Sequence, residues 1–264
     1  MAVDAVLKVI DPQTASNVDL RDIRVVRKLG GTIDDTTLVE GIVFDKCKPS
    51  TANGGPTKIV NARIAVIQFQ IATPKTDLEN SVIIKDYQAM DRIMKEERKI
   101  IAEMVKKIVA SEANVLLIQK SILKDATNEL SLHFLAKKGI MVVQDIERED
   151  VDFICKSIGA VPVAHIDHLS KDKFGHAELC EQTRLEDDAT KIFKITGLKN
   201  AKTVSLLVRG SNPLVIDEAA RSLHDALCVI RSLVKSKALI TGGGSAELEI
   251  SSQLQERATK MKGL

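Results

Sequence analysis

The stretch NVLLIQKSILKDATNELSLHFLAKKGIMVVQDI, residues 114–146, decides the fold. Its first apolar run, NVLLIQ, is typical of a buried strand, and its last, IMVVQDI, is typical of another. Between them, residues 123–138 space their apolar side chains as a helix does, and Gly139 follows as a C-terminal cap. A strand, a helix and a second strand in this order predict parallel strands covered by helices.

The same alternation continues on both sides of this stretch. Upstream, IAVIQFQ at residues 64–70 predicts a strand, and residues 90–110 predict a long helix. Downstream, the pattern predicts a helix over residues 150–158, extended chain over 161–166, strands over 191–198 and 202–210, and a long helix from Asn212 through Val234. The expected class is therefore α/β.

The two ends of the chain have shorter elements. Residues 2–10 predict a short helix, and IRVVRKLGG at 23–31 and LVEGIVFDK at 38–46 predict strands of a small β layer. The loop KPSTANGGPTK at 48–58 is typical of an entry into another domain. The C-terminal part predicts a strand over ALIT, a glycine turn and a last helix.

Composition excludes several classes of protein. With 44% hydrophobic and 28% charged residues, the chain has the balance of a globular protein. Its formal charge is only +2 and its acidic and basic residues are interspersed, so we expect neither nucleic acid nor membrane as a partner. Aromatic residues make up 3%, which leaves few rings to stack on bases.

The expected location is the cytoplasm. The N-terminus lacks the cationic start and apolar run of a signal peptide, and no stretch approaches the roughly 20 apolar residues of a membrane span. His165 and His168 have no third ligand at a metal-site spacing, so we expect no metal site in the protein itself. The cysteines lie far apart without a C-x-x-C pair, which indicates reduced thiols at Cys47, Cys155, Cys180 and Cys228.

The sharpest local signal is the run Gly242, Gly243 and Gly244 between a predicted strand and a predicted helix. Glycines there let the backbone approach a nucleotide, and amides at a helix start accept an anion. A plain tight turn explains the three glycines as well. Neither G-x-x-x-x-G-K-[ST] nor G-x-G-x-x-G occurs in the sequence.

Asp225 is a second candidate. On the helix that starts at Asn212, it lies roughly opposite an apolar stripe formed by Ile216, Ala219, Leu223, Leu227 and Ile230. It should therefore face away from the core. The plain alternative is an exposed ion pair with Arg221, one turn earlier.

The helix over residues 123–138 has two unlike faces. One should pack on the sheet through Ile122, Leu123, Ala126, Leu130 and Phe134. The other mixes polar and apolar side chains and suits weak binding of another chain, unless a neighbouring loop or subunit covers its leucines: Lys124, Asp125, Asn128, Ser131, Leu132 and Leu135. The polar insertion at residues 72–90 carries an apolar trio that also indicates a partner contact: Val82, Ile83 and Ile84.

Seven segments together closely resemble the group II chaperonins of the TCP-1 family. They are KLGGTIDDTTLVEGIVFDK, PKTDLEN, LLIQKSILKDATNELSLHFLAKKGIMVVQDIERED, VAHIDHL, LLVRGSN, RSLHDALCVIR and ALITGGGSAELE. The resemblance implies an apical client-binding domain over 41–201, with a parallel-strand-rich sheet and a helical lid protrusion at about 74–98. This domain is inserted in a split α+β intermediate domain over 1–40 and 202–237, and 238–264 begin a second, α-helical equatorial segment.

The resemblance also implies roles for the candidate residues. Asp225 matches the carboxylate that activates the water attacking the γ-phosphate of ATP. Gly242 to Gly244 match the glycine turn beside the nucleotide, although Ser245 stands where Ala is more usual. Residues 123–138 match the client-facing helix, and Val82, Ile83 and Ile84 fall in the lid.

The family's phosphate loop and the segment that organises Mg²⁺ belong to an N-terminal equatorial part that this sequence does not contain. The resemblance implies ATP and Mg²⁺ as cofactors of the full-length family, and whether this chain is itself an ATPase stays open. It implies a subunit of a cytosolic hetero-oligomeric double ring that binds unfolded clients such as actin and tubulin. The alternatives are an ATP-independent client-holding module and an unrelated α/β enzyme that uses the glycine turn.

Overall fold

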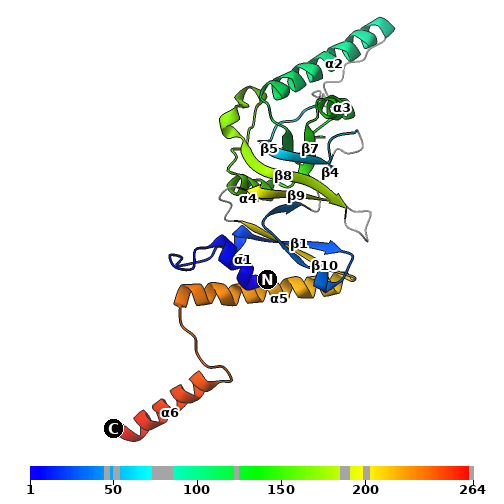
Figure 1. The fold of residues 1–264 in the computed structure, drawn as a ribbon. Coiled ribbons are helices and arrows are strands. Elements are labelled where there is room, and N and C mark those ends of the chain that lie inside the picture. The colour runs from blue at the N-terminus through cyan, green and yellow to red at the C-terminus, as the bar shows by residue number, and fades with distance from the viewer. Residues whose placement is uncertain are drawn as a thin grey trace.

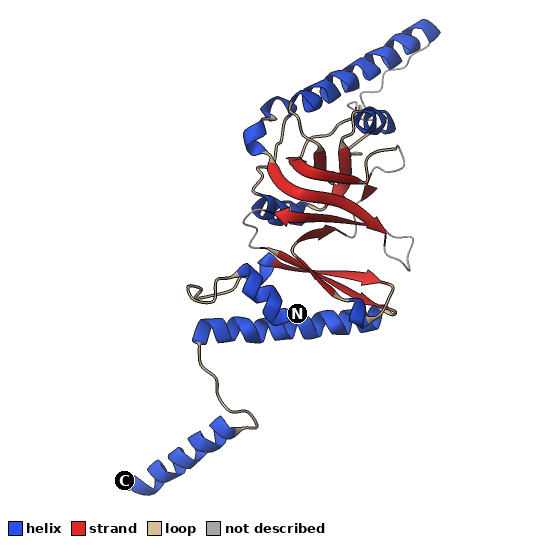
Figure 2. Cartoon of the chain, viewed as in Figure 1, coloured by secondary structure: helices blue, strands red, loops and turns tan. Residues whose placement is uncertain are grey.

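The computed structural model describes residues 1–44, 48–49, 54–72, 86–121, 125–184, 191–198 and 203–261. Within these ranges the chain forms two β-sheets with helices packed against them, which confirms the predicted α/β class (Figures 1 and 2). We call the seven-stranded sheet with α2, α3 and α4 the large unit. The three-stranded sheet with α1 and α5 is the small unit.

The large sheet has the strand order β3-β9-β8-β5-β6-β7-β4. Only β5, β6 and β7 run parallel, and the other neighbours pair antiparallel, so the sheet is more mixed than the alternation of strands and helices predicts. Its strands are β3 (Gly41–Phe44), β4 (Lys48–Pro49), β5 (Lys58–Ile67), β6 (Val115–Gln119), β7 (Met141–Ile146), β8 (Gly175–Arg184) and β9 (Lys191–Leu198).

Alternate residues of the central strands feed two apolar cores. In β5, Ile64 and Val66 face one core, and Ala65 and Ile67 face the other. Helix α4 (Arg148–Ile158) covers the first core with Val151, Ile154 and Ile158. Helices α2 (Tyr87–Ala110) and α3 (Glu129–Lys137) cover the second. Both faces of the parallel central part of the sheet are thus removed from water.

The small unit has the strand order β1-β10-β2, with β1 (Ile23–Leu29) parallel to β10 (Val204–Gly210) and β2 (Thr37–Val39) antiparallel to it. Helices α1 (Ala2–Val9) and α5 (Pro213–Ser236) pack on this sheet and on each other. The Asn212 side chain caps α5 by accepting a hydrogen bond from the Leu214 amide, as the sequence predicts for this helix start. Short 3₁₀ segments complete the described chain: Leu20–Asp22, Ile33–Asp35, Ile166–His168 and Lys171–Lys173.

The chain passes from the small unit to the large one between β2 and β3, and returns between β9 and β10. Gly41, at the first crossing, has φ +146° and lies so close to the Ile195 carbonyl that a side chain would collide with it. The buried Ser205 hydroxyl donates a 2.8 Å hydrogen bond to the Gly41 carbonyl. Glycine is therefore needed where the two crossings touch.

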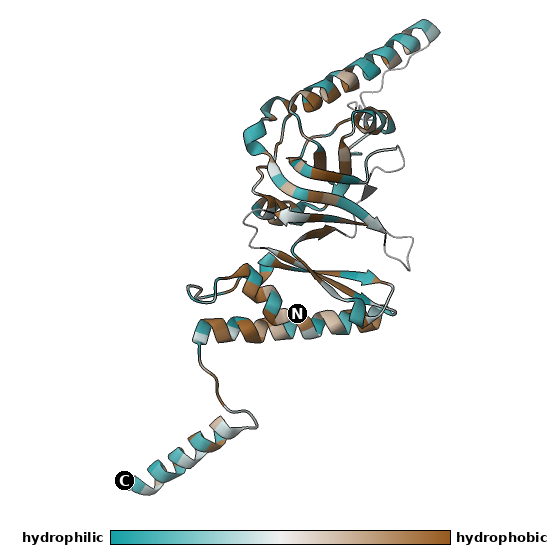
Figure 3. Ribbon diagram, viewed as in Figure 1, coloured by the Kyte–Doolittle hydropathy of each residue, from teal (hydrophilic) through white to brown (hydrophobic). Residues whose placement is uncertain are grey.

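The C-terminal part differs from the sequence prediction. No strand forms over residues 238–241, because ALIT lies against no strand edge with which it could pair, and Leu239 and Ile240 are 84% and 83% exposed. Helix α6 (Ser245–Lys260) follows, has no buried residue and projects away from the other elements (Figures 1 and 3). No helix among the described residues has the length and apolar character to span a bilayer.

Two valines of β5 test the assignment of the core. Val66 is 1% exposed and Val60 is 63% exposed. We expect Val66→Ala to lower the free energy of unfolding by about 2 kcal/mol, because it removes two buried methyl groups and leaves a cavity. Val60→Ala should lower it by less than about 1 kcal/mol. Urea unfolding followed by circular dichroism measures both, and equal losses would contradict the assigned core.

Candidate functional site

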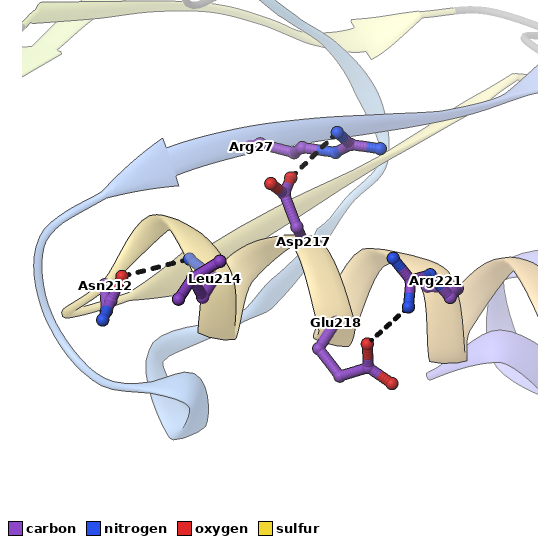
Figure 4. A network of polar contacts seen from close by, with 6 residues as sticks. All are labelled: Arg27, Asn212, Leu214, Asp217, Glu218 and Arg221. Carbon is purple, nitrogen blue, oxygen red and sulfur yellow. Dashed lines mark hydrogen bonds and ion pairs between the residues drawn. The ribbon is translucent and has the colours of Figure 1, made fainter.

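Helix α5 presents Asp225 to solvent. The predicted stripe is confirmed, because Ile216 and Leu227 are buried and Ala219, Leu223 and Ile230 are partly buried, while Asp225 is exposed on the far side. The expected ion pair with Arg221 does not form, since Arg221 instead contacts Glu218 at 2.9 Å (Figure 4). No hydrogen bond or ion pair joins Asp225 to another described residue, so its carboxylate is available to a group outside the small unit.

The start of α5 is fixed firmly to the small sheet. Arg27 of β1 contacts Asp217 of α5 at 3.0 Å, close to the cap formed by Asn212 (Figure 4). Ile216 lies beneath Gly210, where a side chain would meet it at 2.8 Å. These contacts hold the first turns of α5 in place, so the direction in which Asp225 points is set by a rigid helix.

The glycine turn before α6 is open and exposed. Gly243 and Gly244 have φ of +71° and +76°, and a side chain added at Gly242 or Gly243 would meet no atom within 4 Å. The Thr241 and Ser245 hydroxyls, 2.6 Å apart, close the turn. An anionic group has room to approach this backbone and the free amides of the helix start.

The structure does not bring the glycine turn and Asp225 together as one closed site. The turn lies beyond α5, on the segment that leads to the projecting helix α6 (Figure 1). No cluster of three or more His, Cys, Asp or Glu side chains suited to a metal ion occurs in the described part of the chain. Asp225 and the glycine turn therefore each offer one contact to a nucleotide, from separate elements.

Helix α3 corrects the predicted client-facing surface. The helix begins at Glu129 rather than near residue 123, with Asn128 as its cap. The Ser131 hydroxyl accepts a hydrogen bond from the Asn128 amide at 3.0 Å and donates one to the Asn128 carbonyl at 2.6 Å. This turn rotates Ser131 and Leu135 into the core, where both are 0% exposed. The sequence analysis placed both on the exposed face, and that placement was wrong.

Other members of the predicted surface remain accessible. Asp125 and Asn128 are exposed, and Leu132 is partly buried beside the core. Lys124 lies outside the described residues, as do Val82, Ile83 and Ile84 of the predicted lid. The role of these residues in client binding stays a prediction.

An exposed apolar stripe on α2 was not singled out from the sequence. Only the C-terminal half of α2 packs on the sheet, and the other half extends beyond it (Figure 1). The large exposed apolar residues of α2 are Tyr87, Met90, Ile93, Met94 and Ile100. Several of their separations are three, four or seven residues, so the helical spacing of the sequence could have shown this stripe. Helix α2 also contacts α3, the helix that Asn128 caps.

Two of the described cysteines, Cys155 and Cys180, are poor candidates for nucleophilic chemistry. Burial raises the pKa of Cys180 to about 12 and, together with the charge of Asp152, raises the pKa of Cys155 to about 11. A thiol attacks only as a thiolate, so both are unreactive near neutral pH. Cys155, Cys180 and Cys228 are free thiols, as the sequence predicts, and Cys47 lies outside the described residues.

Comparison with known proteins identifies the family. The model of the TCP-1/cpn60 chaperonin family matches residues 1–264. This chain belongs to the TCP-1/cpn60 chaperonin family. Among solved structures, the open-state monomer of a group II chaperonin from Methanococcoides burtonii superimposes on 99% of this chain and 57% of that chain, with a TM-score of 0.75 and 26% identity.

Relatives of this chaperonin-family chain include delta subunits from distant eukaryotes. The T-complex protein 1 subunit delta of Arabidopsis thaliana is 58% identical over 100% of this chain and 49% of its own length. The subunits of the same name from Homo sapiens and Saccharomyces cerevisiae are 54% and 51% identical, over 48% and 50% of their lengths. The chain thus spans about half the length of the curated relatives it matches. The resemblance drawn from the quoted segments, whose wording also points to the delta subunit, is confirmed.

The corrected helix α3 generates a prediction about its two buried residues. Leu135→Ala should lower the free energy of unfolding by about 2–5 kcal/mol because it opens a cavity in the core. Ser131→Val should also destabilise, since it removes the hydroxyl that satisfies the Asn128 amide and carbonyl. His133→Ala, on the exposed side of the same helix, is the matched control. Thermal unfolding of the three variants decides, and a stable Leu135→Ala protein would restore the original placement.

Proposed function

We propose that this chain works as part of a delta-type subunit of an ATP-dependent chaperonin. In this proposal the large unit is the apical domain that binds unfolded polypeptide, and the small unit is the intermediate domain that carries the hydrolytic acid. Residues 238–264, with α6, begin the second equatorial segment. The observation that carries the proposal is the family match along all 264 residues, combined with an exposed and unpartnered carboxylate at Asp225.

Client binding is assigned to the surface around α3 and the projecting half of α2. We define this client surface as the exposed polar side chains Asp125 and Asn128, the partly exposed Leu132, and the apolar stripe of α2: Tyr87, Met90, Ile93, Met94 and Ile100. Exposed apolar side chains among polar ones suit weak contacts with many different unfolded chains. Lys124 and the lid residues Val82, Ile83 and Ile84 are proposed to extend this surface.

Nucleotide chemistry is assigned to Asp225 and the glycine turn. When bound, ATP with Mg²⁺ supplies an activated phosphate bond that water can cleave. The Gly242–Gly244 backbone is proposed to lie beside the phosphates, since no side chain obstructs it. An oxygen of the Asp225 carboxylate is proposed to accept the proton of the attacking water, a role that needs an ionised carboxylate without competing partners.

The proposal places the protein in the cytoplasm, in a hetero-oligomeric double ring with other chaperonin subunits. The delta-subunit relatives support the presence of neighbouring subunits, because a subunit implies an assembly. Clients such as actin and tubulin are part of the proposal. A second candidate function is an ATP-independent holding module, favoured because the glycine turn lies on the segment that leads away from α5, the helix that carries Asp225, to the projecting helix α6 (Figure 1).

The client surface can be tested with the chain alone. We expect the purified chain to slow aggregation of a chemically denatured protein diluted into buffer, with no change on addition of ATP and Mg²⁺. The double variant Met90→Ser, Met94→Ser should lose most of this effect, because it removes exposed apolar contacts without touching a core. Val229→Ser, at a still more exposed apolar site on α5, is the control. Light scattering measures all three, and equal protection by both variants would remove α2 from the client surface.

The hydrolytic role of Asp225 requires an assembled chaperonin that contains this subunit. Asp225→Asn in that subunit should lower its contribution to the kcat of ATP hydrolysis by about 10²–10⁴-fold, because general-base catalysis is lost. The affinity for ATP should change little. Glu218→Gln on the same helix is the control, since Glu218 already pairs with Arg221. Full hydrolysis by the subunit carrying Asp225→Asn would contradict the proposed role of Asp225 as the general base.

A further inference from the structure

The two units meet across a junction that apolar side chains fill only in part. Its apolar centre is a small cluster, which consists of Val26, Val43, Ile192 and Leu207 with Val39 beside them. Next to this cluster, between α4 of the large unit and β1 of the small unit, lie two cavities of about 640 and 360 Å³. Close packing alone therefore does not fix how the large unit sits on the small one.

An ion pair separates the two cavities. Arg24 of β1 donates a 2.8 Å hydrogen bond from Nη2 to Oδ2 of Asp150 of α4, and its Nη1 lies 2.7 Å from Oδ1 of the same carboxylate. Both side chains are about three-quarters buried, with exposed fractions of 24% and 23%. Arg24 and Asp150 line both cavities, so the pair forms the wall between them. A guanidinium that meets both oxygens of a carboxylate fixes the direction of the contact as well as its distance.

A second ion pair joins α4 to the 3₁₀ segment Leu20–Asp22, which leads directly into β1. Lys156 Nζ of α4 lies 2.5 Å from Asp22 Oδ1, and the Asp22 residue is only 9% exposed. Phe153, on the turn of α4 between the two pairs, lies under the Arg24 guanidinium, 5.8 Å from ring centre to Cζ. The face of α4 that carries Asp150, Phe153 and Lys156 points at the small unit. Its other face is packed on the large sheet through Val151, Ile154 and Ile158.

We propose that these two ion pairs, Arg24–Asp150 and Asp22–Lys156, form a junction clasp that sets the orientation of the large unit on the small unit. When Arg24 and Asp150 separate, the large unit turns about the two chain crossings at β2–β3 and β9–β10. The cavities on both sides of Arg24 give room for this movement. The apolar cores of both units stay intact in this movement, because the four clasp residues belong to none of the three main apolar clusters.

This inference does not depend on the proposed function. It concerns two packed bodies joined by a small apolar contact and by directional charge pairs. Interfaces that are mostly polar permit relative motion more readily than large apolar ones. The same chain supplies a matched control, because Arg27, three residues from Arg24 on β1, pairs with Asp217 inside the small unit (Figure 4).

The test measures the distance between the units in the intact chain. A ketone-bearing amino acid at Ser222 of α5 and at Lys137 of α3, both exposed, carries a nitroxide without labelling the native cysteines. Double electron–electron resonance spectroscopy then gives the distribution of distances between the two nitroxides. Arg24→Gln and Arg24→Asp should broaden this distribution and shift its mean, whereas Arg27→Gln should leave it as in the unmodified chain. The reversed pair, Arg24→Asp with Asp150→Arg, should restore the narrow distribution.

Several results would overturn the clasp. An unchanged distribution in both Arg24 variants would mean that the Arg24–Asp150 pair does not set the orientation. An equal broadening in Arg27→Gln would assign the effect to the small unit itself. If Arg24→Asp does not fold, Arg24→Gln and Asp150→Asn give the same readout with neutral side chains. Loss of the far-UV circular dichroism signal in Arg24→Gln would also contradict the proposal, since both cores should persist without the clasp.

Discussion

Three parallel strands that are apolar on both faces set the conditions for the rest of the chain. Where β5, β6 and β7 pair parallel, successive residues alternate between two buried cores, so neither face of this part of the sheet is exposed to water. Each face must therefore be covered. The C-terminal half of α2 and all of α3 cover one face, and α4 covers the other. Because the sheet fixes the positions of these helices, the N-terminal half of α2 extends beyond the sheet. The face of α4 that does not pack on the sheet points at the small unit.

Sequence patterns predicted the elements whose burial is simple. The strands β6, β7 and β9 and the capped helix α5 emerge within a few residues of their predicted bounds, because continuous apolar runs and a regular 3.6-residue stripe reflect burial directly. Strand β8 was missed, since its inward positions hold small residues such as Ala177 and its outward ones hold His176 and Glu178. The strand expected over residues 238–241 fails for the opposite reason. Its residues are apolar, but strand formation needs a neighbouring edge that the pattern of one segment cannot supply.

For the candidate site, the sequence pattern alone predicted the direction of a side chain but not its chemical role. Because α5 is a regular helix, the apolar stripe on one side predicted that Asp225 faces outward on the other. The residues around an exposed carboxylate do not show whether it has a chemical role. That role came from resemblance to a family. On α3 even the geometry failed, because the apolar periodicity was counted from residue 123 and the hydrogen bonds between Ser131 and Asn128 start the helix later. A shift of helix start rotates every following side chain, which exchanged Ser131 and Leu135 between surface and core.

The order of strands in the small sheet has a consequence for how the chain is made. Its central strand, β10, pairs on both sides with β1 and β2, yet Gly41 and Ser205, which share a hydrogen bond at the crossing, are 164 positions apart. A growing polypeptide therefore carries β1 and β2 unpaired while the whole large unit is synthesised. Once the large unit has folded, its two ends lie side by side, so the folded unit acts as a short connection between β2 and β10. The entropy lost when β10 pairs with β1 and β2 is therefore small. The small unit, although it begins the chain, is the part that completes its fold last.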